Sequence, residues 1–378
     1  MRVLLAPDKF KGSLTAAEVA EAVALGLQDR CPDLEVVRVP VADGGDGTVA
    51  AALSAGFSFV EVVAVGPTGE AVHTGYAAQG HRAVVELADV VGLRRLPGQR
   101  LDPLGSSTFG LGVVVAAAID RGATEVVLGL GGSASTDGGA GLVQSLGAAL
   151  TKADGNDLPL GGAALNALHR IDLTALKAKI DGIRFVVASD VDNPLLGPNG
   201  AAAVFGPQKG AGPAELEQLE TGLSVWARLV ADTTGADLST RAGAGAAGGT
   251  GFAALALLGA ELRPGIELVL DLVGFDALLD AADLVITGEG SLDEQSLAGK
   301  APVGVAEAAA RARIRVVAVA GRNLLSDEQL HQAGISAAYP LDTLEPDLAR
   351  SMAHAPDLLR QVGRTIADHW LARAPRTT

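Results

Sequence analysis

The chain has 378 residues, enough for two or three domains of ordinary size, and its 44 acidic and 29 basic residues give a net charge of −15. This charge argues against a protein that binds nucleic acid or an anionic membrane surface, because both functions need a basic face. The single cysteine, Cys31, rules out an intrachain disulfide and fits a reducing compartment, so we expect a cytoplasmic protein.

The N-terminal part of the chain alternates strands and helices. Residues 2–6 form a short apolar run of the kind found in buried parallel strands. Thr15 and Glu18 have the spacing of a capping box, which predicts a helix over residues 15–30. Residues 35–41 alternate as a second strand.

The middle of the chain follows a different order. The expected elements are strands at 72–77 and 83–87, a helix at 108–121, a strand at 125–130, a helix at 138–150, a strand at 185–189, and helices at 214–232 and 248–258. The last helix lies in an uncharged stretch, residues 242–260, which is too rich in glycine for a membrane span.

The C-terminal part returns to alternating strands and helices. We expect strands at 283–287, 315–320 and 336–339, and helices at 302–313, 327–333 and 348–370. Two strands at one end of the chain and three at the other are each too few for a stable parallel sheet. The sequence therefore predicts a discontinuous, doubly wound (flavodoxin-like) parallel-sheet domain of residues 1–66 and 284–378. Residues 67–283 would form an inserted α/β domain with a mixed sheet.

Polar residues gather where the strands of the discontinuous domain end. They are Asp8, Lys9, Lys11 and Ser13 after the first strand, Asp43 and Asp46 after the second, and Gly288, Glu289 and Asp293 after the third. Because the carboxyl ends of parallel strands meet at one edge of a sheet, these loops should converge there on a ligand. Lysines beside a helix N-terminus suit a phosphate or carboxylate, although each loop alone also fits an ordinary capped turn.

The inserted domain carries two further polar loops. Residues 129–134 match the G-x-G-x-x-A pattern of dinucleotide-binding proteins, with Asp154 at the expected distance. The hydroxyls and carboxylate that follow suit phosphate and metal better than a bare pyrophosphate turn, and the candidates are Gly131, Gly132, Ser133 and Asp137. The second loop carries Asp190, Asp192 and Asn193 after a strand, and its carboxylates could act as a general base or bind Mg²⁺.

Six long blocks of sequence share a pattern that extends over the whole chain. They are APDKFKGSLTA (6–16), PVADGGDGT (40–48), GLGGSASTDGGAG (129–141), ASDVDNPLLGPNGAAAVFGPQKGA (188–211), GAGAAGGTG (243–251) and ADLVITGEGSLDEQSLAGKAPVGVAE (282–307). In this order they resemble the bacterial type 1 glycerate kinases. The resemblance implies a flavodoxin-like domain with an inserted α/β domain, and an active site between the two. It also implies transfer of the γ-phosphoryl group of ATP to D-glycerate, giving 2-phosphoglycerate, with Mg²⁺.

The resemblance implies a role for each candidate residue. Lys11, with Ser13 and Lys9, would hold an anionic group, and Asp8, Asp43, Asp46 and Asn193 would line the substrate site. Asp190 is the preferred base or metal ligand, with Asp192 and Asp293 as competitors. The nucleotide phosphates would contact Gly131, Gly132, Ser133, Asp137, Gly288, Glu289 and Lys209, the last of which also fits a surface lysine.

The chain departs from the family pattern at four positions. Lys9, Asp46, Thr136 and Ser291 stand where the family commonly has Ser, Glu, Asn and Arg.

Two other classes of function stay open, an NAD(P)-dependent oxidoreductase of a small hydroxy acid and a non-catalytic sugar-acid-binding protein. No sequence pattern indicates the oligomeric state.

Overall fold

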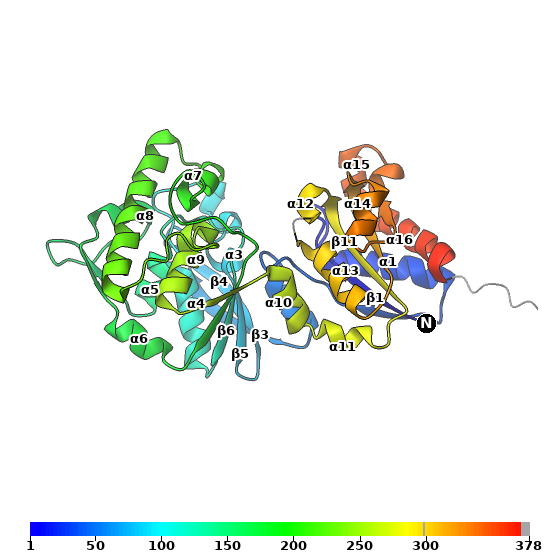
Figure 1. Cartoon of the computed structure of the whole chain (residues 1–378), viewed down its shortest axis with the longest axis horizontal. Coiled ribbons are helices and arrows are strands. Elements are labelled where there is room, and N and C mark those ends of the chain that lie inside the picture. The colour runs from blue at the N-terminus through cyan, green and yellow to red at the C-terminus, as the bar shows by residue number, and fades with distance from the viewer. Residues whose placement is uncertain (298, 372–378) are drawn as a thin grey trace, which may run out of the picture. The chain divides into compact units, whose positions relative to one another are not determined.

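A computed structural model describes residues 1–297 and 299–371, and the chain forms two compact units (Figure 1). Unit 1 contains Met1–Asp43, Ala50–Ala55 and the part of the chain from Ile266 onward, and unit 2 contains Gly44–Val49 and Gly56–Gly265. Each unit is described on its own below.

Unit 1 is built on a five-stranded parallel sheet. In the order of the sheet its strands are β13 (Ala338–Pro340), β12 (Val316–Asn323), β11 (Leu284–Leu292), β1 (Arg2–Pro7) and β2 (Glu35–Arg38). β1 and β11 pair from Val3 with Leu284 to Pro7 with Gly288. The predicted joining of N-terminal and C-terminal strands in one parallel sheet is therefore confirmed.

Helices cover both faces of this sheet, as in a doubly wound fold. Side chains alternate along β1, so Val3 and Leu5 pack against α1 (Ala16–Arg30) and α16 (Ala355–Ile366), and Leu4 and Ala6 belong to the opposite layer. That layer contains α10 (Gly265–Leu272), α11 (Phe275–Leu279), α13 (Ala301–Arg311) and α14 (Asp327–Gln332). The remaining helices ending in unit 1 are α2 (Thr48–Ser54), α12 (Glu294–Leu297) and α15 (Leu348–Ala353), with short turns at Leu341–Thr343 and Ala367–Leu371.

The ends of two helices show how local sequence sets their bounds. The Thr15 hydroxyl accepts the Glu18 N–H at 3.2 Å and the Glu18 carboxylate accepts the Thr15 N–H at 2.8 Å, which confirms the capping box. The single helix expected at 348–370 is interrupted at His354, because Pro356 cannot donate a backbone hydrogen bond and instead occupies the first turn of α16.

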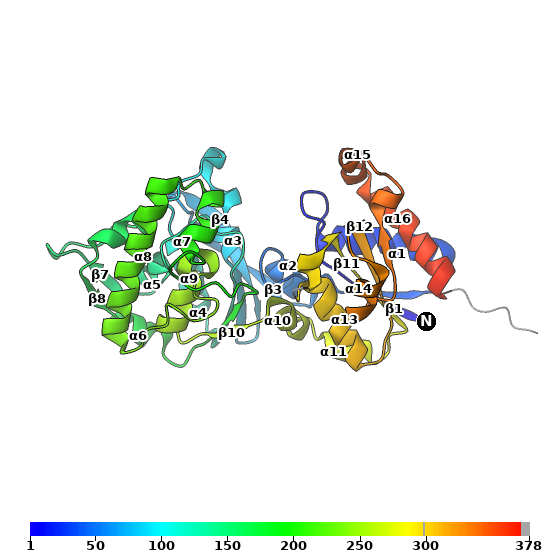
Figure 2. The same cartoon turned by 45° about the horizontal axis from the view of Figure 1, so that its top comes forward.

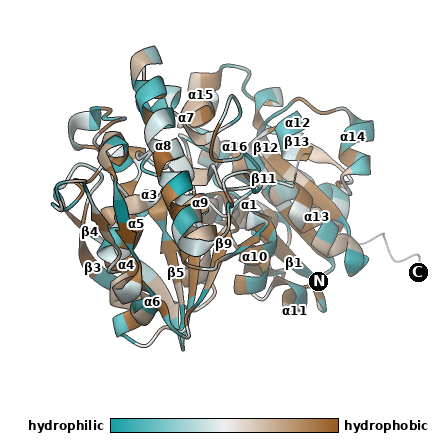
Figure 3. Cartoon of the chain, turned by 60° about the vertical axis from the view of Figure 1, so that its left-hand side comes forward, coloured by the Kyte–Doolittle hydropathy of each residue, from teal (hydrophilic) through white to brown (hydrophobic). Residues whose placement is uncertain are grey.

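Unit 2 is built on a six-stranded mixed sheet. In the order of the sheet its strands are β10 (Glu261–Arg263), β9 (Arg184–Ala188), β6 (Glu125–Gly129), β5 (Arg82–Glu86), β4 (Ala71–Gln79) and β3 (Ser58–Val65). β3, β4 and β5 pair antiparallel, and β5, β6, β9 and β10 pair parallel. The expected mixed sheet is confirmed, and β5 and β9 are coloured as hydrophobic in Figure 3.

The helices of unit 2 pack on one continuous apolar core. They are α3 (Leu87–Val91), α4 (Phe109–Asp120), α5 (Ala140–Ser145), α6 (Thr174–Ile180), α7 (Ala201–Phe205), α8 (Pro213–Thr234) and α9 (Ala246–Leu257). Short 3₁₀ turns lie at Leu93–Arg95, Pro97–Gln99, Gly162–Ala167 and Pro207–Lys209, and β7 (Ala149–Thr151) pairs with β8 (Arg170–Asp172) in a separate hairpin. Trp226 of α8 and Phe252 of α9 meet edge to face, with ring centroids 6.5 Å apart.

The division into units differs from the predicted boundaries at three places. Gly44–Val49, which were expected in the discontinuous domain, belong to unit 2. β3 is not among the strands expected from the sequence, and it belongs to unit 2 because it pairs along its whole length with β4. In contrast, α10 and α11 belong to unit 1, where Ile266, Val269 and Phe275 enter the apolar layer under β1 and β11. Within the described residues, no helix has the length and apolar character needed to cross a membrane.

A close contact between α1 and α16 generates a stability prediction. The two helices lie side by side (Figures 1 and 2), and a Cβ atom at Gly26 would come within 2.1 Å of the Arg360 carbonyl oxygen. Gly26→Ala should therefore lower the free energy of unfolding by about 1–3 kcal/mol, despite the better helix propensity of alanine. Urea unfolding measures this, with the exposed Leu25→Ala as control. An unchanged or raised stability of Gly26→Ala would contradict the packing described.

Candidate active site

Unit 1 places two buried carboxyl groups on adjacent strands, at the edge where β1 ends. Asp8 follows β1 directly, and its N–H donates to the Gly288 carbonyl of β11 at 2.7 Å. Asp8 is 7% exposed and Glu289 is 8% exposed. The predicted substrate residue Asp8 and the predicted phosphate residue Glu289 are therefore neighbours.

The pKa of each carboxyl is raised, chiefly by burial. Burial raises the pKa of Asp8 to about 6; the Lys9 ammonium and backbone N–H oppose this shift and the Asp43 charge adds to it. Burial raises the pKa of Glu289 to about 7; Ser296 and Lys300 oppose this shift, and Asp8 and Asp293 add to it.

The loop after Asp8 is a tight turn in which Lys9 lies beside Asp8 and Lys11 is exposed. Phe10 and Leu14 close the turn, and the Lys9 Nζ lies 3.6 Å from Asp8 Oδ1. Lys11 is exposed, whereas the Ser13 hydroxyl donates to the Met352 carbonyl at 3.0 Å. Of the predicted anion-binding residues, Lys11 therefore faces solvent, while Lys9 and Ser13 contact other groups of unit 1.

The end of β11 is organised by Asp293. Its carboxylate accepts the Gln295 N–H at 3.0 Å and the Ser291 hydroxyl at 3.3 Å. Arg322 of β12 donates from Nε to the Ser291 hydroxyl at 3.0 Å. Ser291 stands where the family pattern has an arginine. The guanidinium of Arg322, on the neighbouring strand, therefore supplies a positive charge beside this position. Gly288 lies within β11, where a Cβ atom would come within 2.2 Å of the Val319 carbonyl oxygen.

In unit 2, two glycine-rich loops pack backbone to backbone. A Cβ atom at Gly131 would come within 2.7 Å of the Gly45 Cα, and one at Gly132 within 2.9 Å of Asp46 Oδ1. Arg94 forms an ion pair with Asp46 at 2.7 Å. The structure thus brings the predicted substrate residue Asp46 next to the predicted phosphate loop.

Glu86, a residue that the sequence reasoning missed, holds the loop that contains Gly45 and Asp46. It is 4% exposed at the end of β5, and its carboxylate accepts the Gly47 N–H at 3.0 Å and the Val49 N–H at 3.2 Å. Burial raises the pKa of Glu86 to about 7; the Asp89 and Asp46 charges add to this shift and the two N–H donors oppose it. In the sequence, Glu86 is only a polar residue at the end of an apolar strand, so no pattern distinguishes it.

Asp137 lies inside unit 2. Its carboxylate is 1% exposed and accepts hydrogen bonds of 2.8–3.2 Å. The donors are the Thr108 N–H and hydroxyl, the Ser107 hydroxyl and the N–H groups of Gly139 and Gly141. In this structure Asp137 therefore fixes the starts of α4 and α5.

Lys209 is also buried rather than exposed. Its side chain is 2% exposed, and its Nζ donates to the Ser133 hydroxyl at 3.0 Å and to the Ser135 carbonyl. Burial lowers the pKa of Lys209 to about 7, and the charge of Asp137 opposes that shift. Lys209 therefore supports the 133–135 loop from within the unit.

The segment after β9 carries the remaining predicted residues. Asp190 and Asp192 are exposed, and Asp190 Oδ1 accepts the Gly265 N–H at 2.7 Å. The Asn193 amide donates to the Asn199 carbonyl at 2.8 Å. Among the described residues, no group of three or more His, Cys, Asp or Glu side chains is placed to hold a metal ion.

The dinucleotide-binding pattern lacks its structural context. After β6 and α5 the chain enters β7, which pairs antiparallel with β8 in a separate hairpin, and Asp154 lies in a turn of that hairpin. The next strand parallel to β6 is β9, which begins at Arg184, so Asp154 does not follow a second parallel strand as the dinucleotide-binding pattern requires.

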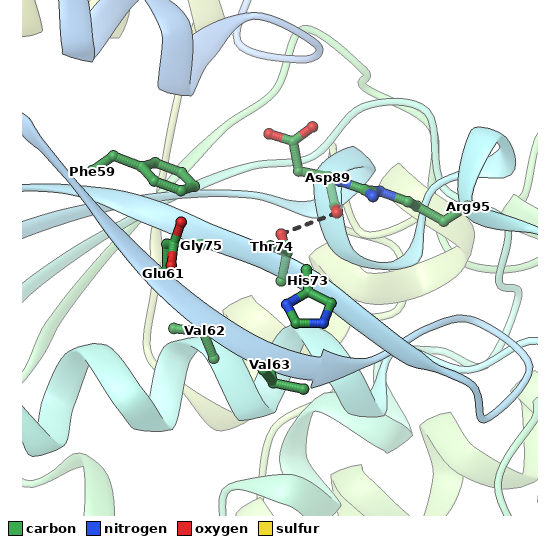
Figure 4. A pocket seen from close by; sticks show the side chains of 9 residues that line it. All are labelled: Phe59, Glu61, Val62, Val63, His73, Thr74, Gly75, Asp89 and Arg95. Atoms are coloured by element: carbon green, nitrogen blue, oxygen red, sulfur yellow. Dashed lines mark hydrogen bonds between the residues drawn. The ribbon is translucent and has the colours of Figure 1, made fainter.

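A separate pocket of about 450 Å³ lies along the β3–β4 hairpin (Figure 4). It is lined by Phe59, Glu61, Val62, Val63, His73, Thr74, Gly75, Asp89 and Arg95. The Thr74 hydroxyl donates to the Asp89 carbonyl at 3.0 Å. None of the predicted site residues lines it.

The buried amine of Lys209 generates a prediction about stability and pH. Between pH 7 and 10.5 the unfolded chain binds a proton at this lysine that the folded chain does not, so raising the pH favours the folded state. From pH 7 to 9, the wild type should gain about 1–2 kcal/mol in free energy of unfolding relative to Lys209→Met. Urea unfolding at both pH values measures this, with the exposed Lys177→Met as control. A pH-independent difference would show that the lysine is charged inside unit 2.

Known proteins share the sequence and the fold of this chain over nearly its whole length. A model of the Glycerate kinase family matches residues 3–371. The chain is 42% identical over 372 residues to a protein of Escherichia coli (strain K12) named glycerate 2-kinase, and 40% identical over 370 residues to a glycerate kinase of Bacillus subtilis (strain 168); each match covers 97% of both chains. A crystal structure of a putative glycerate kinase 2 from Salmonella typhimurium LT2 is similar with a TM-score of 0.84 at 42% identity, covering 97% of both chains. The resemblance seen in the sequence is confirmed, and the chain belongs to the glycerate kinase family.

Proposed function

We propose that this protein transfers the γ-phosphoryl group of ATP to the 2-hydroxyl of D-glycerate, giving 2-phosphoglycerate. The observation that carries the proposal is the match to a glycerate 2-kinase over nearly the whole of both chains. The convergence of charged loops in each unit supports it, because phosphoryl transfer depends mainly on positioning and charge neutralisation.

The anionic groups of the substrates would be held by exposed cations of unit 1. Lys11 is exposed in the turn after β1, and Arg322 lies at the end of β12. Asp293 would act on this site indirectly, since its carboxylate holds Ser291, which in turn accepts the Arg322 hydrogen bond. This assigns Lys11 to direct binding and Asp293 to positioning.

The nucleotide phosphates would contact the backbone of Gly131, Gly132 and Ser133 in unit 2. Successive N–H groups of a glycine-rich loop suit a phosphate, and Lys209 fixes Ser133 from the interior. Lys209 and Asp137 would therefore shape this loop rather than touch the nucleotide, because both are buried.

Asp190 and Asp192 fit Mg²⁺. Both are exposed carboxylates, which are the hard oxygen ligands that Mg²⁺ takes, and the Gly265 N–H fixes one oxygen of Asp190. Mg²⁺ usually binds one or two protein carboxylates together with substrate phosphates, and it would neutralise charge on the transferring group. Of the two roles considered for Asp190, we propose that of metal ligand.

The reaction is tested by a coupled assay of ADP release with D-glycerate, L-glycerate, glycolate and D-lactate. D-glycerate should give the highest kcat/KM, and phosphorus NMR should identify 2-phosphoglycerate as the product. The rival functions give other results. Binding of NAD(P)H detected by fluorescence would favour an oxidoreductase, and binding of glycerate without ADP release would favour a non-catalytic binding protein.

The metal assignment predicts a changed Mg²⁺ requirement. Asp190→Asn keeps the shape of the side chain and removes its charge, so the Mg²⁺ concentration for half-maximal rate should rise about 10- to 100-fold. Titration of Mg²⁺ at saturating ATP and glycerate measures this. Asp181→Asn, an exposed substitution in the same unit, is the matched control. An unchanged Mg²⁺ dependence would rule out Asp190 as a ligand of the metal.

A further inference from the structure

The register of β1 and β11 brings two carboxyl groups together on one face of the unit 1 sheet. Leu4 pairs with Val285 and Ala6 with Thr287, and the next rung contains Asp8 and Glu289. Leu4, Ala6 and Val285 belong to one apolar layer. Because side chains alternate along a strand, the two carboxyl groups continue this layer at the edge of the sheet.

This rung lies at the point where the strand order of the sheet reverses. From β1 the chain passes to β2 on one side, and β11 and β12 follow on the other side. In open α/β sheets, ligands bind outside the carboxyl ends of the strands at such a reversal. Asp8 and Glu289 are therefore placed where a ligand of unit 1 is expected.

Glu289 has an unusual environment for a carboxylate. The residue is 8% exposed, and its Oε1 atom has no hydrogen-bond partner. Buried polar atoms are almost always paired, since an unpaired one loses its hydration without compensation. As a carboxylate, Glu289 has an Oε1 atom that can only accept a hydrogen bond and finds no donor. When Glu289 is protonated, its carboxyl group can donate a hydrogen bond instead.

Asp8 has an environment that suits an ionised carboxylate. Its Oδ1 accepts the Lys9 N–H at 2.7 Å, with the Lys9 ammonium 3.6 Å away. The charged groups that act on Asp8 are Lys9 and Asp43, and those that act on Glu289 are Lys300, Asp8 and Asp293. The contacts with Lys9 favour the charged form of Asp8, whereas the unpaired Oε1 atom of Glu289 favours its protonated form, as for a base and an acid in one site.

We infer that Asp8 is the general base of the reaction and that Glu289 is a positioning residue which serves in its protonated form. The inference rests on the proposed function. The O–H bond of the glycerate hydroxyl breaks and its proton passes to the Asp8 carboxylate, while the hydroxyl oxygen forms a bond to the γ-phosphorus. The bond from that phosphorus to the bridging oxygen breaks, and its electron pair leaves with ADP. The proton then passes from Asp8 to solvent.

The test is the pH dependence of kcat/KM for the whole protein with ATP, Mg²⁺ and D-glycerate. The wild-type activity should rise through about pH 6 as Asp8 ionises, and fall above about pH 7 as Glu289 ionises. Asp8→Asn should lower kcat about 100-fold or more and remove the acidic limb. Glu289→Gln should keep kcat within about tenfold and remove the alkaline limb, because glutamine resembles the protonated acid.

Two controls keep a folding defect separate from a catalytic one. Asp33→Asn changes an exposed aspartate at the amino-terminal edge of the same sheet and should leave both limbs unchanged. Thermal unfolding and calorimetric binding of ATP should show that Asp8→Asn is folded and binds nucleotide.

The outcomes separate this inference from the proposed function. No ADP release by the wild type with any hydroxy acid would overturn the proposed function and this assignment with it. If the wild type phosphorylates glycerate and Asp8→Asn retains a kcat within tenfold of it, or retains the acidic limb, the assignment of Asp8 alone is wrong. An alkaline limb that persists in Glu289→Gln would overturn the role of Glu289.

Discussion

The pairing of β1 with β11 is the contact on which unit 1 depends. The two strands lie about 280 residues apart in the chain, yet they form adjacent central strands of the sheet, and all other strands of the unit add outward from them. The pairing also creates the reversal of strand order and brings Asp8 beside Glu289. The fold of unit 1 and the chemistry proposed for it therefore have one origin.

Unit 2 reaches its arrangement through close approach of backbones. Gly131 and Gly132 let the loop after β6 pack against the loop at Gly45 and Asp46, where any side chain would collide. Such packing leaves few side chains to define the loops, and buried polar groups take over that task. Glu86 holds the loop at Gly45 and Asp46 by accepting hydrogen bonds from N–H groups of that segment. Asp137 and Lys209 hold the loop after β6. The abundance of glycine in the sequence thus has a direct counterpart in buried titratable side chains that anchor the loops.

Features fixed by short stretches of chain could be predicted from the sequence, and features fixed by distant partners could not. The capping box at Thr15 and the apolar strands of the parallel sheet depend on local pattern, and both were predictable. The burial of Lys209, the anchoring by Glu86 and the position of Arg322 beside Ser291 depend on segments far apart in the chain. For the same reason, the candidate residues could be chosen from the sequence, but direct contacts could not be distinguished from supporting ones.

The discontinuity of unit 1 has a consequence for the order of events during synthesis. Residues 56–265 leave the ribosome as one continuous segment, so nearly all of unit 2 is complete while β11 has not been made. Until then β1 can pair only with β2, and its other edge, where β11 belongs, is unpaired. The nascent chain must therefore keep an apolar N-terminal segment of β1, α1 and β2 from aggregating until β11 has been made, and a prefolded unit 2 shortens the distance that this segment has to search.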